Sequence, residues 1–174
     1  MSDLYIVFSV ADAEYALPVS SVRQLETFQG ATRVPGAAAH VAGVVQIRGQ
    51  VLPVVSLRAL FGYPSVSPTL DTRVVVTELG ERQVGLIVDK AREVLRIAPG
   101  SVERTPGLVD EAARGFFGGL VQLGPRVVML LDLRKVVGEE DLNVEFPRQL
   151  EPGAQQLASL PGGSRDDGEA RQER

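Results

Sequence analysis

The residues that could do chemistry in this chain are few and scattered. Its one histidine, His40, lies in GAAAHVAG without a second histidine or any cysteine, and a single ring nitrogen cannot hold zinc. Carboxylates occur singly, as Asp12, Glu14 and Glu81, or together in Glu139–Asp141, where solvated turns or a helix start explain them. A general acid needs an apolar pocket that raises its pKa, and the sequence indicates no such setting. We therefore expect no catalytic and no metal-binding residues.

The sequence also contains no motif that is typical of phosphate or cofactor binding. Gly118-Gly119 follows Phe116-Phe117, but no GxxxxGK[ST] or GxGxxG leads from a strand into a helix, so core packing explains the phenylalanines. We expect no cofactor. An enzyme or a ligand-binding barrel would instead have a deep polar pocket with converging ionisable groups.

Arg48 is the polar residue that the pattern singles out. In VVQIRGQVLPVV, two apolar runs flank Arg48-Gly49, and Gly49 supplies a residue that adopts positive φ without steric penalty, so the turn does not require an arginine. Strand alternation places Val44 and Arg48 on the face opposite Val45, which predicts an arginine beside exposed apolar surface. That arrangement is typical of an interface anchor, although a solvated turn arginine is the simpler interpretation.

Val22 and Leu25 are the second candidate binding pair. The spacing predicts a short helix over Ser20–Glu26, on which residues three apart face the same side. Burial in the core is the alternative explanation for both side chains.

Composition narrows the class of protein. The chain has 174 residues, 44% of them hydrophobic, a formal net charge of -4 and no cysteine. An acidic chain has no general attraction for phosphate, so we expect no nucleic-acid partner. Neither a signal peptide nor an apolar run of membrane-spanning length is apparent, which predicts a cytoplasmic protein without direct membrane insertion.

Strand patterns dominate the remaining sequence. Gly or short polar turns separate most of the Val-, Ile- and Leu-rich runs, and the helical periods are too short to stand without packing on a sheet. We predict strands over Leu4–Val10, Val44–Ile47, Val51–Leu57, Arg73–Leu79, Gln83–Val88 and Arg126–Leu133, and short helices over Ser20–Glu26, Asp89–Leu95 and after Leu57 and Leu133.

The chain also repeats itself. GVVQIRGQVLPVVSLRALFG, residues 43–62, aligns without a gap to GLVQLGPRVVMLLDLRKVVG, residues 119–138, and the segments before them repeat more weakly. We predict a mostly β fold of two small five-stranded, SH3-like barrel lobes on a shared core, over residues 1–70 and 71–147, with strands that can cross between them. Tyr63–Thr72 would connect the lobes, and the Pro-, Gly- and charge-rich residues 148–174 would form a disordered tail.

The order of these blocks resembles the CheW-like coupling proteins of bacterial chemotaxis. The resemblance covers residues 4–137, and the RG-x-V-x-P-V-V-x-L-R segment from Arg48 to Arg58 is its most specific part. It implies a non-catalytic adaptor, recruited to receptor arrays, that joins the cytoplasmic tips of chemoreceptors to the regulatory domain of a CheA-type histidine kinase. In the family, the receptor hairpin lies in the groove between the lobes.

The resemblance also assigns candidate binding residues. The arginine and glycine of the RG motif fall on Arg48 and Gly49, and the apolar residues near the groove on Val22 and Leu25. Family glycines at close contacts fall on Gly43 and Gly85, and Val44 adjoins the first of these.

Two departures from the family pattern leave a second hypothesis open. VQEI and VDLR in the family correspond to VRQL and VSLR here, so Gln24 and Ser56 replace carboxylates. If those carboxylates normally bind a partner, this chain could be a single-partner regulatory or decoy module that limits array assembly or serves a parallel motility pathway.

Overall fold

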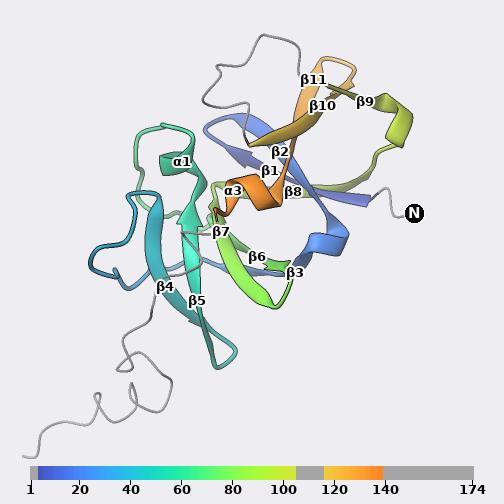
Figure 1. Ribbon diagram of the computed structural model, residues 1–174. Helices are drawn as coiled ribbons and strands as arrows, with labels where there is room; N and C mark the ends of the chain where they lie inside the picture. The colour runs from blue at the N-terminus through green and yellow to red at the C-terminus, as the bar shows by residue number, and fades with distance from the viewer. Residues whose placement is uncertain (1–3, 105–115, 139–174) are drawn as a thin grey trace, which may run out of the picture.

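The structure is a computed structural model that describes residues 4–104 and 116–138 (Figure 1). The expected tail, residues 148–174, and the carboxylates of residues 139–141 lie outside the described residues. In chain order the described elements are β1 (Leu4–Val10), β2 (Ala13–Pro18), the 3-10 turn η1 (Val19–Ser21), β3 (Val22–Thr27), β4 (Val41–Ile47), β5 (Gln50–Ser56), α1 (Leu57–Leu60), β6 (Arg73–Leu79), β7 (Arg82–Val88), β8 (Lys90–Arg96), η2 (Pro99–Ser101), β9 (Val102–Glu103), β10 (Phe117–Leu123), β11 (Arg126–Leu131) and α3 (Leu133–Val136).

These strands form two sheets, which we call the six-stranded lobe and the five-stranded lobe. The first has the order β8-β1-β2-β11-β10-β9 and the second the order β3-β6-β7-β5-β4. The predicted mostly β, two-lobe fold with short helices is confirmed. The sixth strand, β9, has only two residues, and its counterpart in the other lobe is a single bridge between Thr32 and Val44.

The two copies of the repeat exchange strands. Hairpin β1–β2 belongs to the first copy but lies in the six-stranded lobe with β8 to β11, whereas β6–β7 lies in the five-stranded lobe with β3 to β5. The copies match residue for residue, because the parallel pair Val54 with Gly85 corresponds to Leu130 with Ala16. The expected boundary near residue 70 therefore does not follow the sheets, and Tyr63–Thr72 joins α1 to β6 beside one lobe.

Two of the predicted helices are wrong. Most of Ser20–Glu26 and Asp89–Leu95 form the edge strands β3 and β8, which pair with β6 and β1 respectively. A helix of six or seven residues gains little by itself, so a full ladder of hydrogen bonds from the other copy outweighs the local helical spacing. The predicted short helices after Leu57 and Leu133 are confirmed as α1 and α3.

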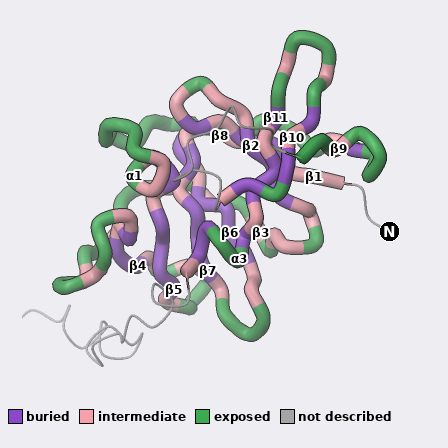
Figure 2. Tube along the Cα trace, turned by 45° about the horizontal axis from the view of Figure 1, so that its top comes forward, coloured by how far each residue is buried: buried purple, intermediate pink, exposed green. Residues whose placement is uncertain are grey.

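The core of the described residues consists of three apolar clusters. Side chains from both sheets, such as Phe8, Tyr15 and Leu86, form a shared core between the lobes, while each lobe also encloses a smaller cluster of its own. In β6, Val75 faces the shared core and its neighbours Val74 and Val76 face the interior of the five-stranded lobe. The central strands are accordingly buried on both faces and the connecting loops are exposed (Figure 2).

Candidate docking surface

The β4–β5 turn holds Arg48 in a strained backbone conformation. Arg48 and Gly49 are the two central residues between Ile47 and Gln50, with φ of 50° and 82°. A two-residue type I′ turn needs positive φ at both positions, which suits glycine and costs about 1 kcal/mol at a residue with a Cβ. The Arg48 side chain is 78% exposed, so packing does not explain its presence.

Among the described residues, Glu26 pairs with this arginine. Its Oε1 lies 3.6 Å from Arg48 Nε and accepts a 2.9 Å hydrogen bond from Gln24 Nε2. Gln24 and Glu26 are two residues apart on β3 and share a face. The missing carboxylate at Gln24 thus has a neighbouring replacement within the same strand.

Val22 and Leu25 lie on one face, as predicted, but for a different reason. They belong to strand β3, and a bulge between Val22 and Gln24 brings Val22 opposite Thr77 and Leu25 opposite Val75. Thr77 and Val75 are two residues apart on β6 and so share a face. Val22 packs on the shared core, whereas Leu25 is 41% exposed. Of the two, Leu25 is the one that exposes apolar surface.

Gly43 and Val44 are buried by the chain's own backbone. Val44 exchanges two hydrogen bonds with Thr32, of 2.9 and 2.8 Å, and is 3% exposed. A Cβ on Gly43, whose φ is 141°, would lie 2.1 Å from the Thr32 carbonyl oxygen. The expectation that Val44 is exposed beside Arg48 is wrong, because the segment around Thr32 covers this edge of β4.

Gly85 is also an interior residue. A Cβ there would lie 2.5 Å from Val74 Cγ1 and 2.8 Å from Val54 Cγ1. The glycine allows strands β5, β6 and β7 to approach inside the five-stranded lobe. Gly43 and Gly85 therefore make close contacts within the chain.

An open groove adjoins the arginine turn. It has a volume of about 570 Å³ and lies between the Thr27–Thr32 segment and β4, with Gln46 and Ile47 among its walls. Exposed Arg48 follows directly after Ile47. Arg48, Gly49, Glu26 and this groove form the candidate docking surface of the five-stranded lobe.

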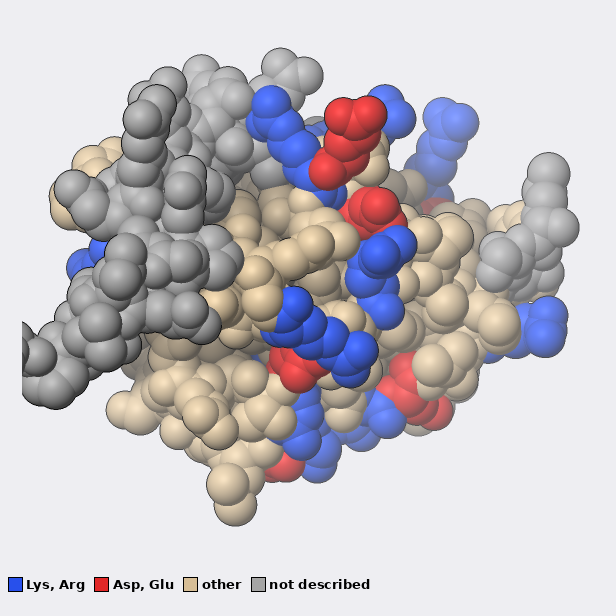
Figure 3. Space-filling view, turned by 90° about the horizontal axis from the view of Figure 1, so that it is seen from below, with Lys and Arg blue, Asp and Glu red and all other residues tan. Residues whose placement is uncertain are grey.

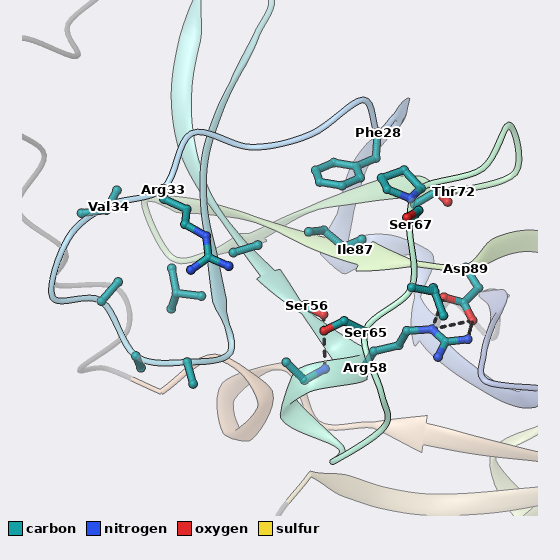
Figure 4. Close-up of a pocket in the computed structure, with 18 residues that line it drawn as sticks. Phe28, Arg33, Val34, Ser56, Arg58, Ser65, Ser67, Thr72, Ile87 and Asp89 are labelled. Carbon is teal, nitrogen blue, oxygen red and sulfur yellow. Dashed lines mark hydrogen bonds and ion pairs between the residues drawn. The ribbon is translucent and has the colours of Figure 1, made fainter.

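A smaller hollow, the α1 cavity, lies on the same lobe (Figure 4). It has a volume of about 300 Å³ and is lined by apolar side chains such as Phe28 and Ile87 and by the hydroxyls of Ser56 and Ser65. Arg33 points toward it from the loop before β4. The cavity therefore combines apolar walls, hydroxyl groups and one exposed cation.

A clamped ion pair forms one wall of the α1 cavity. Arg58 Nε and Nη2 donate to the two Asp89 oxygens at 2.9 and 2.8 Å, and the Ala11 N–H donates to Asp89 Oδ2 at 2.8 Å. Burial opposes ionisation of Asp89, but the hydrogen bonds from Arg58 and Ala11 outweigh it and lower the pKa of the carboxyl. Arg58 also donates to the Pro64 carbonyl, so this arginine fixes the loop after α1.

Ser56 has a structural role in the same wall. Its Oγ accepts a 3.2 Å hydrogen bond from the Ala59 N–H and caps α1. In the other copy Asp132 caps α3 by accepting from the Arg134 N–H at 3.1 Å. Serine and aspartate are both good caps, so the exchange at Ser56 preserves the local structure.

A charge network on the six-stranded lobe was not apparent from the sequence. Arg126 donates to Glu14 at 2.8 and 3.0 Å and to Glu93 at 2.6 Å, and Arg92 Nε lies 3.1 Å from Glu14. The hydrogen bond from Arg126 is the main cause that lowers the pKa of Glu14. Basic and acidic side chains are likewise interspersed on the face in Figure 3, rather than gathered into a patch of one sign. The strand register, once known, brings these residues together.

The described residues contain no cluster of three or more His, Cys, Asp or Glu side chains that could hold a metal ion. His40 contributes its carbonyl to the fold, because that oxygen accepts from the Ser56 N–H at 2.8 Å. Within the described ranges, no helix is both long enough and apolar enough to cross a membrane.

Two β lobes on one core, with exposed groups in turns and on an edge strand, define a protein-interaction module. The chain belongs to the CheW-like domain family, whose pattern matches residues 4–141. A chemotaxis protein CheW of Rhizobium meliloti is 32% identical over 136 residues, which are 78% of this chain and 88% of that protein. The CheW of Bacillus subtilis is 32% identical over 144 residues, 83% and 92% of the two chains.

A solved structure agrees with this assignment. The scaffolding protein TtCheW from Thermoanaerobacter tengcongensis matches with a TM-score of 0.72 at 25% identity, over 81% of this chain and 91% of that one. The two-lobe fold is therefore shared with a scaffolding protein.

Proposed function

We propose that this chain is a non-catalytic adaptor that couples the cytoplasmic tip of chemoreceptors to the regulatory domain of a CheA-type histidine kinase. Membership of the CheW-like family over residues 4–141 supports this function, as do relatives that are chemotaxis proteins and a similar structure that is a scaffolding protein. Two lobes of one plan, each with its own exposed surface, suit a protein that binds two partners at once.

The exposed Arg48 is the observation on which the proposal rests. A protein that used this turn only to join two strands would gain stability from Asn or Gly at the position. Arg48 has a strained backbone, and within the described residues its side chain makes one ion pair, a 3.6 Å contact with Glu26. Because arginine is enriched among the residues that dominate binding energy, we assign Arg48 and Gly49 to partner binding, with Leu25 as an apolar neighbour.

The single-partner alternative is not favoured. It rested on the loss of carboxylates at Gln24 and Ser56. Glu26 provides a carboxylate beside Gln24, and Ser56 caps a helix as aspartate would. Neither exchange leaves a gap on the surface that indicates a lost partner.

Arg48 variants test the proposal. We expect Arg48→Glu to weaken binding of the purified kinase regulatory domain or of a receptor-tip fragment at least tenfold, without unfolding the lobes. Arg48→Asn removes the guanidinium but fits the turn, so it should weaken binding while raising stability by about 0.5 kcal/mol. Isothermal titration and urea denaturation measure the two effects.

The outcomes separate a binding role from a structural one. Loss of binding together with unchanged or higher stability supports the proposal. Unchanged affinity for both partners in both variants would show that Arg48 is only a solvated turn residue.

A further inference from the structure

The α1 cavity of the five-stranded lobe has the size of a site for a small molecule. Its volume is about 300 Å³, and an apolar protein cavity of about 150 Å³ already holds benzene. A helix is about 10 Å wide with its side chains and is too large for such a space. A molecule of about ten non-hydrogen atoms fits, because ligand sites in proteins begin at roughly this volume.

Arg33 gives the lining of the cavity a net positive charge. The lysines, arginines and carboxylates among the lining residues are Arg33, Arg58 and Asp89. Asp89 accepts hydrogen bonds from two nitrogens of Arg58 and from the Ala11 N–H, so the charges of Arg58 and Asp89 neutralise each other. Arg33 is exposed and forms no ion pair within residues 4–104 and 116–138. Its guanidinium, which points toward the cavity in Figure 4, is therefore available to an anion.

The apolar part of the lining lies apart from this guanidinium. Figure 4 shows Phe28 and Ile87 on one side of the cavity and Arg33 on the other. Phe28 and Ile87 pack on the smaller apolar cluster of the five-stranded lobe, which fixes their positions. Ser65 adds a hydroxyl from the loop after α1, and Arg58 holds that loop through the Pro64 carbonyl. A bound molecule would thus meet a cation at one end and apolar side chains at the other.

We propose that the α1 cavity binds a small organic carboxylate with an apolar body, such as an aryl-substituted or branched alkyl acid. The carboxylate pairs with the Arg33 guanidinium through two parallel hydrogen bonds, which orients the molecule, and the apolar body lies against Phe28 and Ile87. Phe28 also lines the open groove beside β4, so the ligand would touch a residue that borders the candidate docking surface. This binding site is separate from the adaptor function and does not depend on it.

An NMR titration of the full-length chain with 3-phenylpropionate tests the site. We expect amide shifts concentrated at the lining segments, residues 33–42, 56–59 and 65–72, and a dissociation constant on the order of 1 mM. The uncharged 3-phenylpropionamide has a similar shape and should bind roughly tenfold more weakly, because it cannot form an ion pair. Acetate, which lacks the apolar body, should also bind more weakly than 3-phenylpropionate.

Two variants locate the charge that the ligand recognises. Arg33→Gln should weaken binding of 3-phenylpropionate roughly tenfold and abolish the preference for the acid over the amide. Arg96→Gln is the matched control, because Arg96 is exposed on β8 of the other lobe and its removal subtracts the same charge away from the cavity. This control should bind 3-phenylpropionate as the wild-type chain does.

A loss of binding in Arg33→Gln, with wild-type binding in Arg96→Gln, supports the inference. If Arg33→Gln bound the acid unchanged, if both variants lost affinity equally, or if the wild-type chain bound the amide as well as the acid, the binding would be adventitious and the inference overturned. Absence of shifts at the lining residues up to about 10 mM acid would overturn it as well. No protein partner is present in this experiment, so a failure of the adaptor function would not change its result.

Discussion

The two lobes share a backbone plan but distribute their charges differently. On the six-stranded lobe Arg126, Glu14 and Glu93 form a network, whereas the matching residues of the five-stranded lobe are Gln50, Gln83 and Gln24. At the helix ends the order reverses: Arg58 is clamped by Asp89, but Arg134 is not paired within the described residues.

This difference shows which parts of a duplicated fold are fixed and which are free. Strand pairing recurs in both copies, and so does the close-contact glycine at Gly43 and Gly119, whereas Gly85 corresponds to Ala16. Charge pairs do not recur. The six-stranded lobe pairs Arg126 with Glu14 and Glu93, whereas the five-stranded lobe pairs Arg58 with Asp89. Among the exposed cations, Arg48 lies in a turn of the five-stranded lobe, and Arg134 lies on α3, which follows the last strand of the six-stranded lobe.

Gly43 and Gly119 occupy matching positions, each against a segment that covers one edge of its lobe. Alanine substitutions at these two glycines should give the largest difference in stability loss between the copies. Gly43 has φ of 141° and no room for a Cβ beside the Thr32 carbonyl, so Gly43→Ala should destabilise the protein by roughly 3 kcal/mol. Gly119→Ala should cost about half as much, because its Cβ would meet Val102 Cγ1 at 2.8 Å and Glu103 O at 2.9 Å, with the two-residue strand β9 free to shift. Urea denaturation compares them, and equal losses would contradict the account.

The second largest difference should be between the stability losses caused by replacing Arg58 and Arg134, the arginines of α1 and α3. Arg58 and Asp89 side chains are 20% and 28% exposed, and Arg58→Ala leaves a half-buried carboxylate unpaired, at a cost of about 2 kcal/mol. Arg134→Ala should change stability by less than about 0.5 kcal/mol, because the side chain is exposed and has no ion pair among residues 4–104 and 116–138. Thermal denaturation of both variants checks this pair. A comparable drop in both would show that Arg134 has a structural partner.

Acid should reduce the stability that the paired carboxylates Asp89 and Glu14 contribute. The pKa values of Asp89 and Glu14 are lowered in the folded state, so the unfolded chain takes up these protons at higher pH. Their stabilisation is complete above the ordinary carboxyl pKa of about 4 and is lost as pH falls through the lowered values. We expect the free energy of unfolding to fall less steeply with acid in Asp89→Asn and Glu14→Gln, by denaturation between pH 3 and pH 7. Wild-type acid dependence in both variants would exclude this explanation.

The helix caps should give the smallest effect. Ser56→Ala removes a capping oxygen and should cost about 1 kcal/mol, and Asp132→Ala should cost a similar amount. Ser56→Asp restores the family residue, caps the same N–H and should leave both stability and partner affinity nearly unchanged. If Ser56→Asp instead strengthened binding of a partner, the carboxylate would have a role outside the helix.

Much of the fold was predictable from local patterns. Leu4–Val10 and Arg73–Leu79 match the observed strands, because their apolar runs and flanking turns are unambiguous. The local spacing of Ser20–Glu26 and Asp89–Leu95 predicts helices, but both segments form strands because their pairing partners belong to the other copy. The exchange of hairpins between lobes depends on the same long-range pairing, which no local pattern contains.

Of the candidate docking surface, only the exposed turn with Arg48 was predictable from the sequence. Arg48 stood out because the turn did not need it, and the structure places it on the surface. Val44 was misplaced because the covering Thr32 segment has no strand pattern. Arg134 was visible only as the repeat partner of Arg58, and its different surroundings depend on Asp89 and Ser20, which become comparable once the register is known.

The most direct test of the adaptor function is to mix the full-length chain with the kinase regulatory domain and a receptor-tip fragment and to measure the mass of the product. Size-exclusion chromatography with light scattering should show one complex that contains all three proteins. A mixture in which each partner displaces the other, or in which neither binds, would contradict a bridge made by two separate surfaces.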